Sequence, residues 1–203
     1  GPVSRLAFDQ GVMPLEVAFW RAVLAWICFG GHAAASGQMR IQARDLPFLL
    51  IFSVTGVTLF YGSYQLAVEK GGAALAAVLL YTAPAWVTVL SRMVFKEPLT
   101  LVKCAALAMT IAGVAGVSYG VGSGASGFGG QLDATAFLFG LIAGFCYSLY
   151  YIFGKYFSGR YDSPTIFLYI LPLGALLLLP WVTFSPKTAV AWGALATLAF
   201  FST

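Results

Sequence analysis

Long apolar runs, separated by short polar or charged connections, make up almost the whole chain. A transmembrane helix needs about 20 mostly apolar residues. Runs of this kind lie at 14–34, 46–68, 73–95, 99–120, 134–156 and 164–182, with an apolar remnant at 1–8 and a further run from Val190. Membrane β-strands would instead alternate polar and apolar residues over about ten positions, and the sequence shows no such alternation. The pattern therefore predicts an all-α polytopic membrane protein. Because both ends of the sequence fall inside apparent spans, we expect it to be part of a longer chain.

Prolines and one acidic residue mark the starts of these helices. Pro14, Pro98 and Pro164 each stand at a predicted helix start, where the missing N–H does no harm. Asp133 is placed to cap the helix that follows it. The glycine-rich segment 121–133 predicts a flexible connector.

Composition agrees with this assignment. The chain is 60% hydrophobic and 9% charged, with a mean hydropathy of +0.88, whereas an ordinary soluble domain is about 25% charged. The net charge is +4, but the basic residues form no cluster, so we expect no nucleic-acid partner. Cys28, Cys104 and Cys146 lie inside apolar runs at wide spacing, which indicates reduced thiols rather than disulfides or a metal site.

Lysine and arginine in the connections predict the orientation, because cytoplasmic loops carry the excess. Counting alternate connections gives seven basic residues on one side and three on the other. The first group is Arg40, Arg44, Arg92, Lys96, Lys103, Lys155 and Arg160, and the second is Arg5, Lys70 and Lys187. The first side is therefore expected in the cytoplasm and the segment 121–133 outside.

A weak internal repeat appears when the chain is shifted by 150 residues. The matched pairs are Arg5 with Lys155, Pro14 with Pro164, and Phe19 with Tyr169. The two helices that these prolines open would run in opposite directions through the membrane. Inverted repeats with a site between them are a common plan among transporters.

The run AALAAVLLYTAPAWVTVLSRMVFKEPLTLVKCAALAMTIAGVAGVSYG (73–120) resembles the EamA family of the drug/metabolite transporter superfamily. The features shared are small residues at its start, a mid-run proline, a terminal Glu-Pro, and glycines in the following helix. They are Pro84, Glu97, Pro98, Gly113 and Gly116. The segment VMPLEVAFWRAVLAWI (12–27) also resembles the second helix of that family.

The resemblance implies a bundle of ten helices in two inverted five-helix repeats, of which about seven to eight are represented here. On this basis residues 1–120 are a first repeat with a truncated first helix, 121–133 an external connector, and 134–203 the start of a second repeat. The resemblance also implies export of small metabolites, often amino acids, by alternating access. We therefore expect an integral protein of the inner membrane of a bacterial cell.

Three helices carry polar and aromatic residues on single faces, which suggests a shared substrate cavity. Tyr61, Tyr64 and Gln65 share one face by helical spacing, as do Tyr81, Pro84, Ala85 and Thr88 in the next run. Gly144, Tyr147, Ser148 and Tyr151 form a third such face. The candidate substrate-binding residues are Tyr61, Tyr64, Gln65, Tyr81, Trp86, Tyr147 and Arg21. Hydroxyls and aromatic faces suit a neutral or zwitterionic, partly apolar substrate, although tyrosines also favour the lipid–water interface.

Arg21 and Pro84 have two interpretations each. Arg21 either lines the cavity or extends to the membrane surface. Pro84 is either a functional hinge or a static kink, and Glu97 with Pro98 is read as a helix terminator rather than as a chemical group. Glu16 lies in the first turn of its helix and is expected to be solvated.

Small residues at four-residue spacing predict close helix packing within the chain. They are Ala112, Gly116 and Gly120 in one helix, and Gly140, Gly144 and Ser148 in the next.

The sequence does not favour an enzymatic function. Residues 116–120 match G-x-S-x-G, and Gly122, Gly124 and Gly127 match G-x-G-x-x-G, but neither follows a predicted strand. We expect no catalytic residue, metal or cofactor, and as partners only a small molecule, membrane lipid and, if the protein is a homodimer rather than a monomer, a second copy. The alternative function is a channel-like or structural membrane protein without active transport.

Overall fold

A computed structural model describes residues 2–37, 39–98, 100–122 and 133–201. The α-helices are α1 (Pro2–Asp9), α2 (Pro14–Ser36), α3 (Leu46–Phe52), α4 (Phe60–Leu80), α5 (Ala83–Phe95), α6 (Leu101–Gly122), α7 (Ala134–Phe157), α8 (Ser163–Leu178) and α9 (Ala189–Phe201). Three further helical segments are the 3-10 turns η1 (Ala43–Asp45) and η3 (Leu179–Trp181) and the π-helical η2 (Ser53–Leu59). The prediction of an all-α protein is confirmed, because the described residues form helices and loops only.

Four of the described helical stretches are long and apolar enough to cross a bilayer. They are Pro14–Ser36, Ala43–Leu80, Ala134–Phe157 and Ser163–Trp181. The apolar helices Ala83–Phe95, Leu101–Gly113 and Ala189–Phe200 are shorter. Length and composition together thus support an integral polytopic membrane protein.

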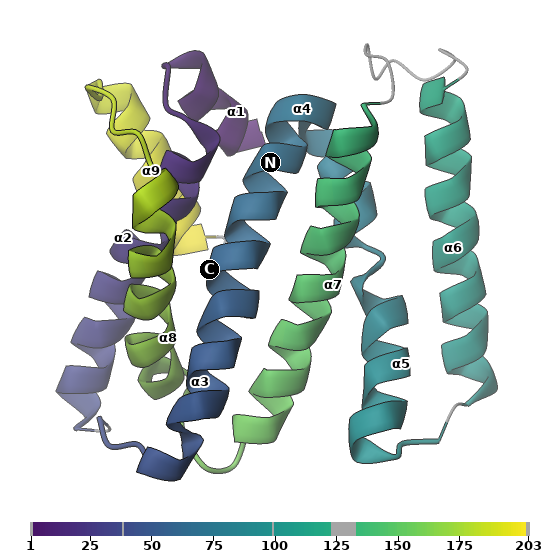
Figure 1. Ribbon diagram of the computed structural model, residues 1–203, viewed down its shortest axis with the longest axis horizontal. Helices are drawn as coiled ribbons and strands as arrows, with labels where there is room; N and C mark the ends of the chain where they lie inside the picture. Colours follow the sequence, from purple (N-terminus) through teal and green to yellow (C-terminus); the bar gives the residue numbers. More distant parts are fainter. Residues whose placement is uncertain (1, 38, 99, 123–132, 202–203) are drawn as a thin grey trace.

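Helix α4 contains a reversal of direction that the apolar pattern anticipated. Gly72 has φ 85° and ψ 162°, outside the helical region, in a backbone conformation that glycine adopts without steric cost. The chain therefore ends one membrane segment at about residue 71 and begins the next at 73, where the sequence pattern placed the boundary between its runs 46–68 and 73–95. Figure 1 shows α4 turning at one end of the bundle and continuing toward α5.

The predicted single helix over 73–95 is wrong in its middle. Helix α4 ends at Leu80, Tyr81 and Thr82 form a turn, and α5 begins at Ala83. Pro84 therefore occupies the first turn of α5, where a proline removes no helical hydrogen bond. Proline was expected to bend a continuous helix, and it instead stands at the start of a new one.

The other boundary signals agree with the structure. Pro14 and Pro164 lie in the first turns of α2 and α8. The Asp133 carboxylate accepts a hydrogen bond of 2.8 Å from the backbone N–H of Thr135, which confirms the predicted cap of α7. Helix α5 ends at Phe95 and α6 begins at Leu101, so Glu97 and Pro98 follow the end of α5 as predicted, but Pro98 precedes α6 and does not stand in its first turn.

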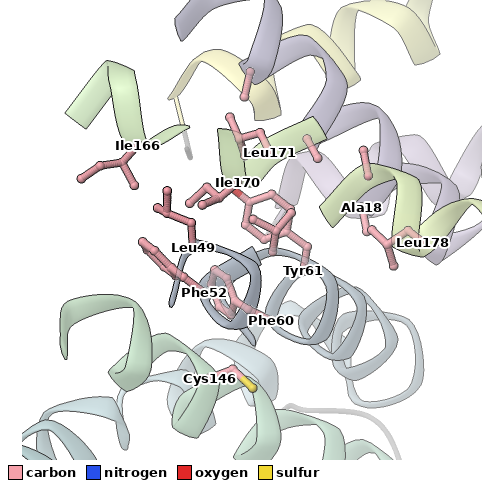
Figure 2. Packing of buried hydrophobic residues seen from close by; sticks show 14 of the residues in the cluster. Ala18, Leu49, Phe52, Phe60, Tyr61, Cys146, Ile166, Ile170, Leu171 and Leu178 are labelled. Atoms are coloured by element: carbon pink, nitrogen blue, oxygen red, sulfur yellow. The ribbon is translucent and has the colours of Figure 1, made fainter. Parts of the chain in front are cut away.

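The core lies where α2, α4, α7 and α8 meet. The most extensive contacts are those of α4 with α7 and of α2 with α8, and α6 stands at one edge of the bundle (Figure 1). Figure 2 shows Phe60 and Tyr61 of α4 in this core, with Leu49 and Phe52 of α3, Ile170 and Leu171 of α8, and Cys146 of α7 around them. Ser53 and Thr58 in η2 donate to the carbonyls of Ile170 and Gly174 at 2.8 and 3.1 Å, which joins this segment to α8.

Glycines of α7 allow it to approach α4 very closely. A Cβ on Gly140 would lie 2.4 Å from Leu79 Cδ1, and one on Gly144 would lie 2.5 Å from Thr82 Oγ1 and 2.8 Å from the Leu79 carbonyl oxygen. Close packing by these two small residues within the chain is thereby confirmed. In α6, by contrast, a Cβ on Gly116 would meet nothing within 4 Å, so this glycine makes no such close approach.

The connections gather at two ends of the bundle (Figure 1). The α2–α3, α5–α6 and α7–α8 connections share one end, and the α1–α2 and α8–α9 connections lie at the other. The first end is the basic one, for which the sequence predicts a cytoplasmic position.

Candidate functional site

A cavity of about 210 Å³ lies between α2, α4 and α7. Its lining residues combine one cation with aromatic and apolar side chains. They are Arg21, Phe60, Tyr61, Tyr64, Leu80, Tyr147 and Tyr150. Arg21 is seven residues into α2 and Tyr147 is thirteen residues into α7, which at 1.5 Å per residue is about 10 and 20 Å from their helix starts. The cavity therefore lies within the depth of the bundle rather than at its ends.

Arg21 forms the polar side of this cavity. Its side chain is 5% exposed, and its Cζ lies 4.2 Å from the centroid of the Tyr61 ring. Tyr61 is itself only 2% exposed. A desolvated cation over an aromatic face is stabilised by about 2 kcal/mol, so the contact fixes the position of the guanidinium group.

Aromatic rings form the opposite side. Phe60 and Tyr147 stack with ring centroids 5.1 Å apart, and Tyr150 lies 6.2 Å from Tyr147. The hydroxyls of Tyr147 and Tyr151 are hydrogen bonded at 3.2 Å. This pairing orients Tyr147 and leaves its ring face toward the other aromatic residues.

The helix break begins directly after a residue that lines the cavity. Leu80 lines it at the last residue of α4, and the Thr82 hydroxyl donates to the Leu79 carbonyl at 2.7 Å. Gly144 of α7 permits this turn to pack against it. Breaks in membrane helices are tolerated where neighbouring groups satisfy the freed backbone, and the Thr82 hydroxyl is such a group.

The structure brings together four of the predicted substrate-binding residues, namely Arg21, Tyr61, Tyr64 and Tyr147. The other three lie elsewhere. Gln65 is fully buried one turn from Tyr61, and neither of its amide atoms has a hydrogen-bond partner. Tyr81 is 69% exposed in the turn between α4 and α5.

Trp86 lines a different cavity. It faces an apolar cavity of about 570 Å³ between α5, α6 and α7, where its ring contacts Phe145 with centroids 5.4 Å apart. The hydroxyls of Thr82 and Thr110 on this lining already donate to the carbonyls of Leu79 and Ala106. The larger cavity thus offers little polar recognition, and the smaller one around Arg21 is the better candidate site.

Sequence reasoning missed three lining residues, Phe60, Leu80 and Tyr150. Tyr150 follows Tyr147 by three residues, so the helical-spacing rule used for the other tyrosines was sufficient to find it. Phe60 and Leu80 are apolar residues in apolar helices and carry no such signal.

Glu16 is buried, and the expectation of a solvated residue is wrong. Its carboxylate is ion-paired with Lys187 and accepts a hydrogen bond of 2.9 Å from the Ser185 hydroxyl. Lys187, in the α8–α9 connection, is 7% exposed and lies 5.2 Å from the Trp20 ring and 5.5 Å from the Trp192 ring. The pair therefore joins the start of α2 to the α8–α9 connection inside an aromatic enclosure.

Two polar contacts join the first and second halves of the chain at the basic end. Asp45, 2% exposed, accepts hydrogen bonds from Arg160 at 3.2 Å and from the Tyr161 hydroxyl at 2.7 Å. Donation to this carboxylate raises the pKa of Tyr161.

Glu97 forms the second contact, because it is ion-paired with Lys155 of α7 and, at 3.0 Å, with Lys103. Hydrogen bonds from Lys155 and then Lys103 lower the pKa of the Glu97 carboxyl.

The described residues contain no group of three or more His, Cys, Asp or Glu side chains that could hold a metal ion. The G-x-S-x-G string at 116–120 lies within helix α6, so it does not form the strand-to-helix elbow that a nucleophilic serine of this type requires.

Together the fold and the cavity define a polytopic α-helical membrane protein with a cationic, aromatic cavity between its helices. The model of the EamA-like transporter family matches residues 1–119, more than half of the 203 residues. The chain belongs to that family, which confirms the resemblance found in the sequence.

Individual relatives agree with this membership. The chain is 28% identical to an uncharacterized transporter of Archaeoglobus fulgidus, over 88% of this chain and 63% of that protein. It is 24% identical to the uncharacterized transporter YdfC of Bacillus subtilis, over 75% of this chain and 48% of that protein. The chain thus spans less than two thirds of the length of these curated relatives.

A solved crystal structure has the same fold. It matches 96% of this chain and 68% of its own chain with a TM-score of 0.67 and 19% sequence identity. At this identity the likeness supports the arrangement of the helices alone.

Proposed function

We propose that the protein exports small metabolites, including amino acids, through the cavity around Arg21 by alternating access between two inverted repeats. The observation that carries the proposal is the convergence of α2, α4 and α7 on one cavity with a buried cation and five tyrosine or phenylalanine rings. Buried charges inside membrane bundles are costly, and they mark substrate or ion pathways. Family membership and relatives named as transporters support the same activity.

The helix directions fit the proposed repeats. Helices α2 and α8, each opened by a proline, cross the bundle in opposite directions and pack against each other (Figure 1). An inverted repeat requires opposite directions of its matched helices. The cavity then lies between α2 and α4 of the first proposed repeat and α7 of the second.

Tyr150 suggests the route from the basic end. It lines the Arg21 cavity and also a second cavity of about 410 Å³ that reaches Tyr161 and Asp162 in the α7–α8 connection. In this proposal, movement of this shared side chain connects the two spaces. The basic end would then be the side of substrate entry.

Alanine substitutions in the complete gene product test the proposal. We expect Tyr61→Ala and Tyr147→Ala, which remove rings that line the cavity, each to reduce export of loaded radiolabelled amino acids from membrane vesicles, while the amount of folded protein in the membrane stays normal. Gln65→Ala is expected to do the same if this buried amide, one turn from Tyr61, faces the substrate during transport. Tyr81→Ala is expected to reduce export as well if the turn between α4 and α5 moves toward the cavity during transport.

The matched control is Trp181→Ala, which removes an aromatic side chain that is 67% exposed in η3 and is not among the residues that line the cavity. This variant is expected to transport at the original rate. Normal export by all the tyrosine and glutamine variants would contradict the assignment of the site. Export by no version of the protein would favour the channel-like or structural alternative.

A further inference from the structure

We propose that the Arg21 cavity selects its substrate by a carboxylate, and that an amino group on the substrate is dispensable. The substrate class is a small monocarboxylate with an aromatic or branched apolar side chain, of which an apolar amino acid is one example. This inference rests on the proposed function, because it concerns the same cavity.

The charge of the lining is the first step. Among the lining residues Arg21 is the one with a fixed charge at neutral pH, and the others are tyrosine, phenylalanine and leucine. A guanidinium group does not deprotonate in proteins. Because electrostatic interactions strengthen as the effective dielectric constant falls, a cation that is 5% exposed makes the cavity attractive to anions and repels cations.

The geometry of Arg21 is the second step. Its guanidinium carbon lies 4.2 Å from the Tyr61 ring centroid, and Tyr61 is held in the buried core. The ring contact restrains a long side chain that would otherwise lose conformational entropy on binding. A guanidinium group presents planar N–H donors that match the two oxygens of a carboxylate.

The remainder of the lining explains why an amino group adds little. An ammonium group in this cavity would meet aromatic faces and tyrosine hydroxyls, but no carboxylate among the lining residues, and it would lie near the Arg21 cation. The ring pair of Phe60 and Tyr147, with Tyr150 beside it, suits an apolar group. The volume of about 210 Å³ is below the roughly 300–1,000 Å³ of drug-sized sites, which limits the substrate to amino-acid size.

Four compounds that share a phenylethyl group separate the two charges. 3-Phenylpropionate has the carboxylate alone, phenylalanine has both groups, phenylalanine amide has the amino group alone on a similar frame, and phenethylamine has the amino group on the bare frame. We would titrate each into the complete, purified gene product in lipid nanodiscs and measure binding by the shift in melting temperature. The expected result is binding of both carboxylates, with the amide and the amine weaker by about 10- to 100-fold, the loss typical of a hydrogen-bonded charge.

Variants of Arg21 provide the matched test. Arg21→Gln is expected to weaken both carboxylates by about 10- to 100-fold, and Arg21→Lys is expected to give intermediate binding because it keeps the charge without the planar fork. Arg40→Gln is the control, since it removes one positive charge from an exposed connection and should bind like the original protein. If Arg21→Gln does not fold, the four-compound series and Arg21→Lys still decide.

Two results would overturn the inference. One is binding of phenylalanine amide or phenethylamine as tight as that of the carboxylates, and the other is failure of 3-phenylpropionate to bind, whether or not phenylalanine does. If either result occurs while Tyr147→Ala still abolishes export, the proposed transport function stands and only the carboxylate selection fails. If Tyr147→Ala and Tyr61→Ala both transport normally while the carboxylates bind through Arg21, the cavity is a binding site off the transport path.

Discussion

Gly144 is the residue at which α7 comes closest to the helix break. Any side chain there would collide with the Thr82 hydroxyl at 2.5 Å and with the backbone oxygen of Leu79 at 2.8 Å. A hydroxyl can rotate away, but a backbone oxygen moves only with its helix. The packing of α7 on the end of α4 therefore requires glycine, which has no Cβ, at this position.

We expect Gly144→Ala to destabilise the protein by about 1–3 kcal/mol, the usual cost of overpacking a filled interior. The measurement is the free energy of unfolding in mixed detergent, followed by circular dichroism. Gly154→Ala is the matched control in the same helix, because a Cβ there meets nothing within 4 Å. That variant should be neutral or more stable by up to about 1 kcal/mol from helix propensity. Equal effects of the two substitutions would contradict the packing argument.

Individual cavity residues were partly predictable because helical spacing relates side chains on one helix. Tyr61 and Tyr64 share a face by spacing alone, and both line the cavity. Tyr81 was placed with them by assuming a continuous helix, and the turn at Tyr81 and Thr82 changes the direction of its side chain. Spacing rules hold only within an unbroken helix, so the break limited what could be predicted beyond it.

The ion pair between Glu16 and Lys187 joins α2 to the α8–α9 connection. Both groups are buried, at 0% and 7% exposure, and aromatic rings of Trp20, Phe184 and Trp192 surround the ammonium group. Removal of one partner from a buried pair leaves the other charge without compensation, which typically costs about 3–5 kcal/mol. Replacement of both partners avoids that cost.

We therefore expect Glu16→Gln and Lys187→Met each to lower the free energy of unfolding by about 3–5 kcal/mol, and the double variant to lose clearly less than the sum. A double-mutant cycle measures this coupling directly. Lys103→Met is the control, because its pair with Glu97 is partly exposed, at 38% and 30%, and should have little effect. Additive losses in the cycle would show that the two residues do not act as a pair.

Pro84 keeps α4 and α5 apart, and without this proline the two helices could join into one. As the proline of the first turn of α5 it has no N–H to donate, and in a continuous helix its ring would clash with the carbonyl of Leu80. Alanine removes both obstacles. The turn at Tyr81 and Thr82 would then be free to become helical.

If the break is a hinge, Pro84→Ala should leave folded protein in the membrane, slow export by the complete gene product, and increase the hydrogen-exchange protection of the amides at 81–83. Pro47→Ala is the matched control, since Pro47 also lies in the first turn of its helix, α3. This variant is expected to export at the original rate. An unchanged export rate for Pro84→Ala would show that the break is static.

The bundle as a whole was more predictable than its contacts. Hydropathy alone located the membrane runs, because a bilayer demands about 20 apolar residues per crossing, and Gly72 ends a run where the pattern placed a boundary. Which helices pair is a different question, since lipid-facing and core-facing residues are equally apolar. The pairing of α4 with α7 and the burial of Glu16 against Lys187 join residues far apart in the sequence, so neither is visible in a local pattern.

The orientation of the bundle in the membrane remains a prediction, and single cysteines can test it. The α2–α3 and α8–α9 connections lie at opposite ends of the bundle (Figure 1), and the excess of lysine and arginine predicts that the first is cytoplasmic. In a background without Cys28, Cys104 and Cys146, we expect a cysteine at Thr183, exposed in the α8–α9 connection, to react with a membrane-impermeant maleimide added to intact cells. A cysteine at Ser126, in the predicted external connector and outside the described residues, should react in the same way.

A cysteine at Gln42, exposed in the α2–α3 connection, is expected to react only after the cells are opened, because the bilayer then no longer separates it from the reagent. Labelling of Gln42 alone from outside would keep the arrangement of the helices and reverse the bundle in the membrane. Labelling of Gln42 and Thr183 from the same side would contradict the arrangement itself, since these two positions lie at opposite ends of a bundle whose helices must cross the bilayer.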